Sequence, residues 1–148
     1  MKLASIPLAL LLLTQLPAVA APAAVTDFTA ELVARSFLRS LLDGRPAGAL
    51  PLCGAEVNLD GRKLRDRTEL QQALETVSSR ARRRGLRLRQ LLILDGAEAV
   101  RRFGQPPRRL RGSVGPGSLV ALARLSQLGA AVVLRREGGF WRVTALTD

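Results

Sequence analysis

The stretch AVVLRREGGFWRVTALTD, residues 131–148, decides the fold of this chain more than any other segment. It begins with an apolar run, turns at Glu137-Gly138-Gly139, and continues into a second run that carries the only tryptophan, Trp141. Two β-prone runs separated by a short glycine turn are typical of a β-hairpin. We therefore predict two antiparallel strands here, at the end of a larger sheet.

Upstream of the hairpin, the chain alternates between helical and strand patterns. Apolar residues recur at helical spacing after residue 26 and again after Asp66, and Gly44 and Gly85 end these two predicted helices. Strands are predicted over 56–64, 86–94, 118–125, 130–136 and 140–147, with a short helix at 97–103. Short turns between successive strands favour an antiparallel sheet. We expect one α+β domain over residues 26–148, with about four to five antiparallel strands and two helices on one face.

Residues 1–20 have the pattern of an export signal. Lys2 supplies a basic start, an apolar run follows, and Ala18-Val19-Ala20 places small residues where a signal peptidase cleaves. The alternative, an uncleaved membrane anchor, needs roughly 20 apolar residues, and this run is shorter. We expect a bacterial periplasmic or secreted protein that begins near Ala21, with residues 21–25 preceding the domain. Mass spectrometry of the natively expressed protein tests this, and an intact Met1 terminus in the cytoplasmic fraction would contradict it.

The composition excludes several kinds of chemistry. The chain has no histidine and no tyrosine, so a histidine-based nucleophile pair and an imidazole acid or base are excluded. The usual His/Cys zinc sites are excluded too, and we expect neither a metal nor a cofactor. Cys53 is the only cysteine, so no internal disulfide can form, and its apolar neighbours indicate a buried structural thiol. The net charge of +11 attracts anionic partners.

Three segments give the chain a resemblance to a known superfamily. They are an opening helix that ends in Leu41-Leu42-Asp43-Gly44, a strand-to-helix passage over 57–70, and the closing hairpin around Gly139-Phe140-Trp141. In this pattern the chain resembles the nuclear transport factor 2-like superfamily, which includes ketosteroid-isomerase-like and polyketide-cyclase-like domains. The resemblance implies a strongly bent sheet wrapped around the N-terminal helices as a cone with one open end. Members use that cavity for binding, for catalysis or not at all, and many form homodimers through the outer sheet face.

The resemblance also indicates which residues are candidates to face a cavity. We take Phe37, Leu59 and Trp141 as candidate ligand contacts, although a large aromatic in a terminal strand is more often ordinary core. Asp60, Asp66 and Glu98 are the carboxylates nearest the expected opening. Asp60 is more simply a turn residue and Asp66 a helix cap, so we assign no catalytic residue.

The densest basic cluster follows the second predicted helix into the next strand. We call it the arginine cluster, and it consists of Arg80, Arg82, Arg83, Arg84, Arg87 and Arg89. One interpretation is contact with an anionic envelope surface, and the alternative is a solvated face near the negative end of the helix dipole. Nucleic acid is not expected, because no aromatic side chains are interleaved to stack on bases.

Two functions remain open from the sequence. The first is an exported, non-enzymatic module that binds a small apolar molecule or a protein partner. The second is a small-molecule enzyme of the isomerase, dehydratase or hydrolase type that uses a cavity carboxylate. A carboxylate deep in the cavity and free of arginine partners would favour the enzyme, whereas an apolar interior would favour the binding module.

Overall fold

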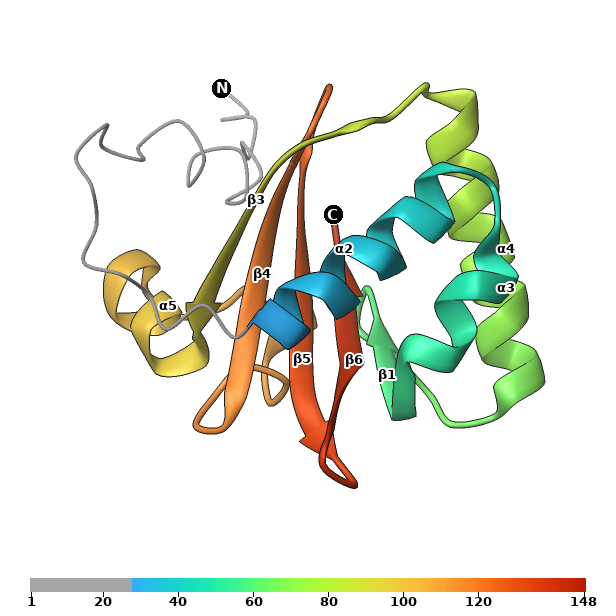
Figure 1. Cartoon of the computed structure of the whole chain (residues 1–148). Helices are drawn as coiled ribbons and strands as arrows, with labels where there is room; N and C mark the ends of the chain where they lie inside the picture. Colours follow the sequence, from blue (N-terminus) through green and yellow to red (C-terminus); the bar gives the residue numbers. More distant parts are fainter. Residues whose placement is uncertain (1–27) are drawn as a thin grey trace, which may run out of the picture.

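The computed structural model describes residues 28–148, and the predicted export signal, the segment 21–25 and the start of the domain at 26 lie outside this range. Within it, the chain forms four α-helices and a six-stranded sheet (Figure 1). The helices are α2 (Phe28–Leu42), α3 (Pro46–Ala49), α4 (Arg67–Arg83) and α5 (Gly96–Phe103), with 3-10 turns η1 (Leu50–Leu52) and η2 (Arg108–Leu110). None of these helices is long and apolar enough to cross a membrane.

The two long helices form where the sequence predicted them. Buried residues of α2 recur at three- and four-residue spacing and make one apolar stripe that faces the sheet: Ala30, Ala34, Phe37, Leu38 and Leu41. At the start of α4, the Asp66 side chain accepts a hydrogen bond from the Glu69 amide at 2.9 Å, which satisfies a free donor of the first turn. Ser78 of α4 donates to the Leu41 carbonyl at 2.7 Å and fixes α4 against the end of α2.

The sheet differs from the prediction in strand number and in direction. Its order is β2-β1-β6-β5-β4-β3, and it is open rather than closed. The strands are β1 (Cys53–Leu59), β2 (Arg62–Leu64), β3 (Leu88–Asp95), β4 (Ser118–Leu125), β5 (Gly129–Glu137) and β6 (Phe140–Thr147). The count of four to five was wrong because Asp60 and Gly61, with φ of 56° and 94°, form a tight two-residue turn that divides one predicted strand into β1 and β2.

The pairing between β1 and β6 is parallel, whereas the other strand pairs are antiparallel. The expected all-antiparallel sheet was therefore wrong at this position. Most of the fold separates these two strands in sequence, so no short turn forces them to run in opposite directions. The β5–β6 hairpin is as predicted, with Gly138 and Gly139 at φ of 58° and 82° between the paired residues Glu137 and Phe140.

Alternation along the strands gives the sheet an apolar surface on both sides. On one side, residues such as Val132 and Leu134 pack with α2 and α4 in the larger core. On the other side, Val120, Val133 and Ala145 pack with Ala99 of α5 and Leu110 of η2 in a second core. Figure 1 shows α5 lying away from α2, α3 and α4. The two long helices α2 and α4 cover one face, as expected, whereas the chain from 96 to 117, here called the cover segment, packs on the outer face.

The cover segment lies on the face through which we expected a homodimer to form, and homodimer formation itself stays a prediction. It is held to the sheet by partly buried hydrogen bonds as well as by apolar packing. Asn58 Nδ2 donates to the Arg109 carbonyl at 2.7 Å, and Arg135 donates to the Ser113 carbonyl at 3.2 Å. The outer face is therefore largely occupied by the chain's own residues.

Cys53 is buried at the start of β1, as predicted for a structural thiol. Burial raises the pKa of the Cys53 thiol from 9.0 to about 12, although the positive charge of Arg67 acts in the opposite direction. Since the thiolate is the nucleophilic form, Cys53 is unreactive at neutral pH while the protein is folded.

Candidate functional site

An apolar pocket opens between α2, α4 and the end of the sheet formed by β1, β6 and the turn between β4 and β5. Its cavity volume is about 100 Å³. The apolar side chains that line it are Leu38, Leu41, Leu42, Leu59, Val77, Ala81, Leu86, Leu125, Leu128, Ala130 and Leu146. We call this site the leucine pocket, because eight of these eleven side chains are leucines.

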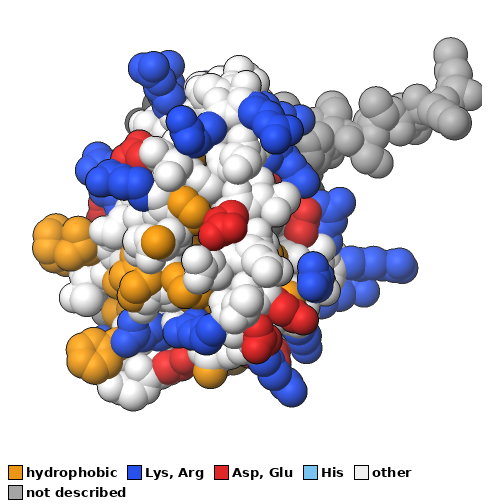
Figure 2. Space-filling model, turned by 90° about the vertical axis from the view of Figure 1, so that its right-hand side faces the viewer, with side chains coloured by type: hydrophobic (Ala, Val, Ile, Leu, Met, Phe, Trp, Pro, Cys, Tyr) orange, Lys and Arg blue, Asp and Glu red, His pale blue; other side chains and the backbone are white. Residues whose placement is uncertain are grey.

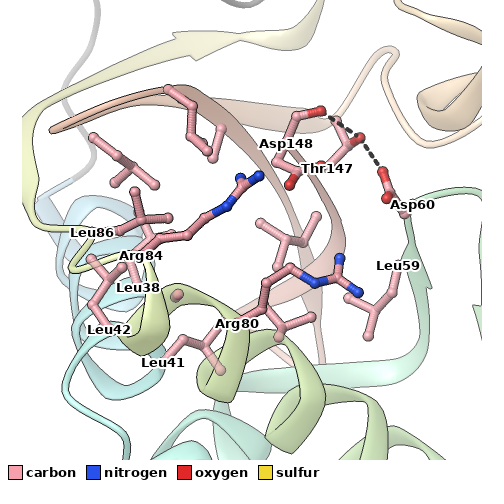
Figure 3. Close-up of a pocket in the computed structure, with 16 residues that line it drawn as sticks. Leu38, Leu41, Leu42, Leu59, Asp60, Arg80, Arg84, Leu86, Thr147 and Asp148 are labelled. Atoms are coloured by element: carbon pink, nitrogen blue, oxygen red, sulfur yellow. Dashed lines mark hydrogen bonds between the residues drawn. The ribbon is translucent and has the colours of Figure 1, made fainter.

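The remaining lining residues are polar or charged, and all of them except the buried Thr147 are exposed at the opening. They are Asp60, Arg80, Arg84, Thr147 and Asp148. Figure 3 shows the guanidinium groups of Arg80 and Arg84 extending from α4 toward the side on which Asp60, Thr147 and Asp148 lie. The pocket thus has an apolar interior and a charged mouth.

The Asp60 carboxylate accepts two hydrogen bonds at this mouth. Thr147 Oγ1 donates to Asp60 Oδ1 at 2.7 Å, and Arg109 Nη1 donates to the same oxygen at 2.9 Å (Figure 3 shows the first of these bonds). Arg109 belongs to the cover segment, so an ion pair links the outer cover to the mouth of the pocket. The carboxylate is therefore held in position with an arginine partner, and its side chain is partly exposed rather than deep inside.

The structure separates the three predicted cavity residues. Leu59 lines the leucine pocket. Phe37 is fully buried in the larger core and does not line the pocket. Trp141 is half-buried at the far end of β6, where its ring packs against the core and lies 5.0 Å from the Arg136 guanidinium carbon.

The other two candidate carboxylates lie away from the pocket. Asp66 caps α4, as its alternative interpretation predicted. Glu98 lies on α5 in the cover segment and pairs with Arg101 and with Arg102, whose Nε lies 2.6 Å from its carboxylate oxygen. Within residues 28–148, no group of three or more acidic or cysteine side chains is arranged to hold a metal ion.

The members of the arginine cluster lie in three different environments. Arg80 and Arg84 line the leucine pocket, whereas Arg82 and Arg87 line a neighbouring, more polar groove of about 630 Å³. Arg83 and Arg89 are exposed and line neither. Figure 2, which views the molecule from the side of α3 and α4, shows basic side chains spread over this face with acidic ones between them. The cluster is therefore not one continuous basic surface.

The spacing of residues along α4 indicates which arginines lie at the mouth of the pocket, and the sequence prediction did not use it. Val77 and Ala81 lie on the pocket side of α4, and Arg80 and Arg84 are displaced from them by three residues each, which places all four on one side of the helix. The arginines at the end of that stripe were interpreted as a surface cluster alone. Leu128 and Asp148 carried no sequence signal, because their positions depend on where the sheet ends.

Comparison with solved structures identifies the fold. One similar structure is a candidate ketosteroid isomerase from Shewanella frigidimarina, with a TM-score of 0.54 and 14% identity over 84% of this chain and 98% of that one. Another is a protein of unknown function with a cystatin-like fold from Nostoc punctiforme, with a TM-score of 0.52 and 15% identity over 86% and 92% of the two chains. An NTF2-like protein of unknown function from Pseudomonas putida aligns with a TM-score of 0.48 and 15% identity over 84% and 87%.

These likenesses confirm the expected resemblance at the level of the fold: the described part of the chain has the nuclear transport factor 2-like fold. No family model matches the sequence, and no curated protein matches it. The fold hosts many functions, so the activity has to be argued from the leucine pocket itself.

Proposed function

We propose that this protein is an exported, non-enzymatic binding module that takes an apolar part of a small molecule into the leucine pocket. The observation that carries the proposal is the pocket's interior, in which leucine, valine and alanine side chains surround the space and every charged lining residue lies at the mouth. Export is supported by the pattern of residues 1–20. Concave, mostly apolar sites with a few polar groups at one side are typical of small-molecule binding.

The size of the pocket limits what it can hold. An apolar cavity of roughly 150 Å³ is enough to bind benzene, and the leucine pocket, at about 100 Å³, is somewhat smaller. A short alkyl segment or the edge of a ring fits this volume. The rest of the ligand would then lie at the mouth, among Arg80, Arg84 and Asp60.

The enzyme alternative has less support from the geometry. It needs a carboxylate inside the cavity that can exchange a proton with the substrate. Asp60 is at the mouth, and it already accepts hydrogen bonds from Arg109 and Thr147. The side chains around it offer neither a tyrosine nor a histidine as a second proton donor, because the chain contains none.

The proposal is tested with N-phenyl-1-naphthylamine, a neutral probe whose fluorescence rises in an apolar site. We expect saturable binding by the wild-type protein. Ala81→Phe and Ala130→Phe each place a large side chain where a buried alanine lines the pocket, so each should weaken probe binding at least tenfold. Ala97→Phe is the matched control, because Ala97 is exposed on α5 across the sheet.

Thermal unfolding of every variant shows which of them fold, and a single folded pocket-filling variant is sufficient for the test. Absence of saturable binding by the wild type would overturn the proposal. So would undiminished binding by a folded Ala81→Phe or Ala130→Phe protein, because the probe would then occupy another site.

A further inference from the structure

The mouth of the leucine pocket presents two arginines whose charge is not neutralised by a neighbouring carboxylate. Among residues 28–148, the guanidinium groups of Arg80 and Arg84 have no carboxylate within ion-pair distance, whereas Asp60 is paired with Arg109. Arg80 lies in the last turn of α4 and Arg84 caps its C-terminal end four residues later, which places the two on the same face of the helix. Both line the pocket.

The balance of side-chain charge around the mouth is positive. Arg80 and Arg84 line the pocket together with Asp60 and Asp148, and Arg109 adds a third positive charge beside Asp60. Arg82 and Arg87 line the adjoining groove, where Leu42 and Leu86 form a wall shared with the leucine pocket. An anionic group at the mouth would therefore meet two available guanidinium groups in a positive surrounding field.

We propose that the leucine pocket binds a single-chain amphiphile with an anionic head, such as a fatty acid or an alkyl phosphate. This inference rests on the proposed function, since it assigns a ligand class to the same pocket. The end of the apolar chain enters among the leucines, the rest of the chain lies along the shared wall of Leu42 and Leu86, and the head accepts charge-assisted hydrogen bonds from Arg80 and Arg84. Guanidinium groups bind carboxylate and phosphate oxygens through paired donors, so they select an anionic head over a neutral one.

The cluster has a different role in this proposal from the one expected from sequence. Contact with an extended anionic surface would use the exposed arginines together, and Arg83 and Arg89 would contribute as much as Arg80 and Arg84. A ligand in the pocket uses only the two arginines that line it. These two pairs therefore provide a charge-matched comparison on one protein.

The test measures displacement of N-phenyl-1-naphthylamine by ligands that share one alkyl chain and differ in the head. The ligands are decanoate, decyl phosphate, decanol and decyltrimethylammonium, each used below its micelle concentration. For the wild type at pH 7.5 and low salt, we expect decanoate and decyl phosphate to bind about tenfold more tightly than decanol. Decyltrimethylammonium should bind most weakly. Inorganic phosphate alone should not displace the probe, because it lacks the chain.

The double variant Arg80→Gln/Arg84→Gln should lose the preference for the anionic heads, with less than a twofold change for decanol. Arg83→Gln/Arg89→Gln removes the same charge from exposed positions outside the pocket, and it should retain most of the preference. Glutamine keeps a long side chain that is compatible with a helix. Raising the salt concentration should reduce the wild-type preference.

The outcomes separate the two proposals. If the neutral probe and decanol bind but the anionic ligands bind no better, the anionic-head inference is wrong and the proposed function stands. If neither the probe nor any ligand binds, the proposed function is wrong. Equal loss of preference in both double variants would indicate the general field of the protein and overturn the inference. Preference for decyltrimethylammonium would instead assign the head site to Asp60 and Asp148.

Discussion

Replacing Phe37 by alanine is expected to lower the free energy of unfolding by about 3–5 kcal/mol, the usual range for removing a buried aromatic ring. Phe37 lies in the middle of α2 with no exposed surface, and its ring packs in the larger core between the helix and the sheet. Truncation would leave a cavity that the surrounding leucines and valines cannot fill without moving. Chemical denaturation of the wild type and the variant measures the difference.

Two aromatic residues of β6 provide controls for this prediction. Phe140 is 66% exposed, so Phe140→Ala should change stability by no more than about 0.5 kcal/mol. Trp141 is half-buried and packs on the edge of the core, so Trp141→Ala should fall between the other two variants. Near-native stability of the Phe37 variant, or a larger loss for Trp141, would contradict this assignment of the core.

The Trp141 comparison illustrates what periodicity could and could not predict. The alternating pattern of β6 identified a strand, and its bounds match the prediction because Gly138 and Gly139 fix the turn before it. The sequence left two positions open for Trp141, a contact in the ligand cavity or ordinary core. In the structure it lies near the hairpin end, where the sheet extends beyond α2 and α4 and one side of the ring meets Arg136.

The arrangement of the sheet shows where local patterns stop being informative. Hairpins are encoded by short turns, so β1–β2 and β5–β6 each depend on a few adjacent residues. The parallel pairing of β1 with β6 depends on packing across the whole domain, and no local residue indicates it. The same holds for the cover segment, whose Gly- and Pro-rich sequence is typical of a loop but whose Leu110 is buried against the outer face.

The existence of a cavity could be predicted from the sequence, but the residues that form its mouth could not. The resemblance implied a cavity at the open end of the sheet, and Leu59, one of the three candidate ligand contacts, lines the leucine pocket. The mouth could not be predicted, because it joins the end of α4 to the end of β6 and the β1–β2 turn. These segments are far apart in sequence, and only the packing of α4 against α2 brings them together.

The second large effect is expected at Asn58, which joins the sheet to the cover segment. Asn58 is 5% exposed, and its Nδ2 donates to the Arg109 carbonyl at 2.7 Å and to Ser113 Oγ at 3.2 Å. Its Oδ1 accepts from the Gly61 amide at 2.8 Å. Asn58→Asp keeps the shape and the acceptor but replaces the donor with an oxygen that faces the Arg109 carbonyl. We expect a loss of about 2–3 kcal/mol at neutral pH, since the Arg109 carbonyl loses its donor and a buried negative charge then faces that carbonyl oxygen.

The pH dependence of the stability of Asn58→Asp shows whether the loss comes from the charge of the introduced carboxyl group. Burial beside a carbonyl oxygen favours the protonated form of the introduced carboxyl group, so its pKa should be higher in the folded state than in the unfolded state. A group with a raised folded pKa stabilises the fold fully below its unfolded pKa, and this contribution is lost as the pH rises through the folded pKa. The deficit relative to wild type should therefore shrink near pH 4, where the protonated carboxyl group can again donate to Arg109.

Ser113→Ala is the matched control, because it removes the weaker partner of Asn58 and leaves the bond to Arg109. Its loss should be about 0.5–1 kcal/mol, with no such dependence on pH. Trypsin cleavage at the cover segment's arginines provides a local measurement, and we expect it to be faster in Asn58→Asp than in Ser113→Ala. Equal stability of Asn58→Asp and wild type at neutral pH would show that the hydrogen bonds of Asn58 do not hold the cover segment in place. In that case the Arg109–Asp60 ion pair, rather than Asn58, would be the polar link between the outer cover and the mouth of the leucine pocket.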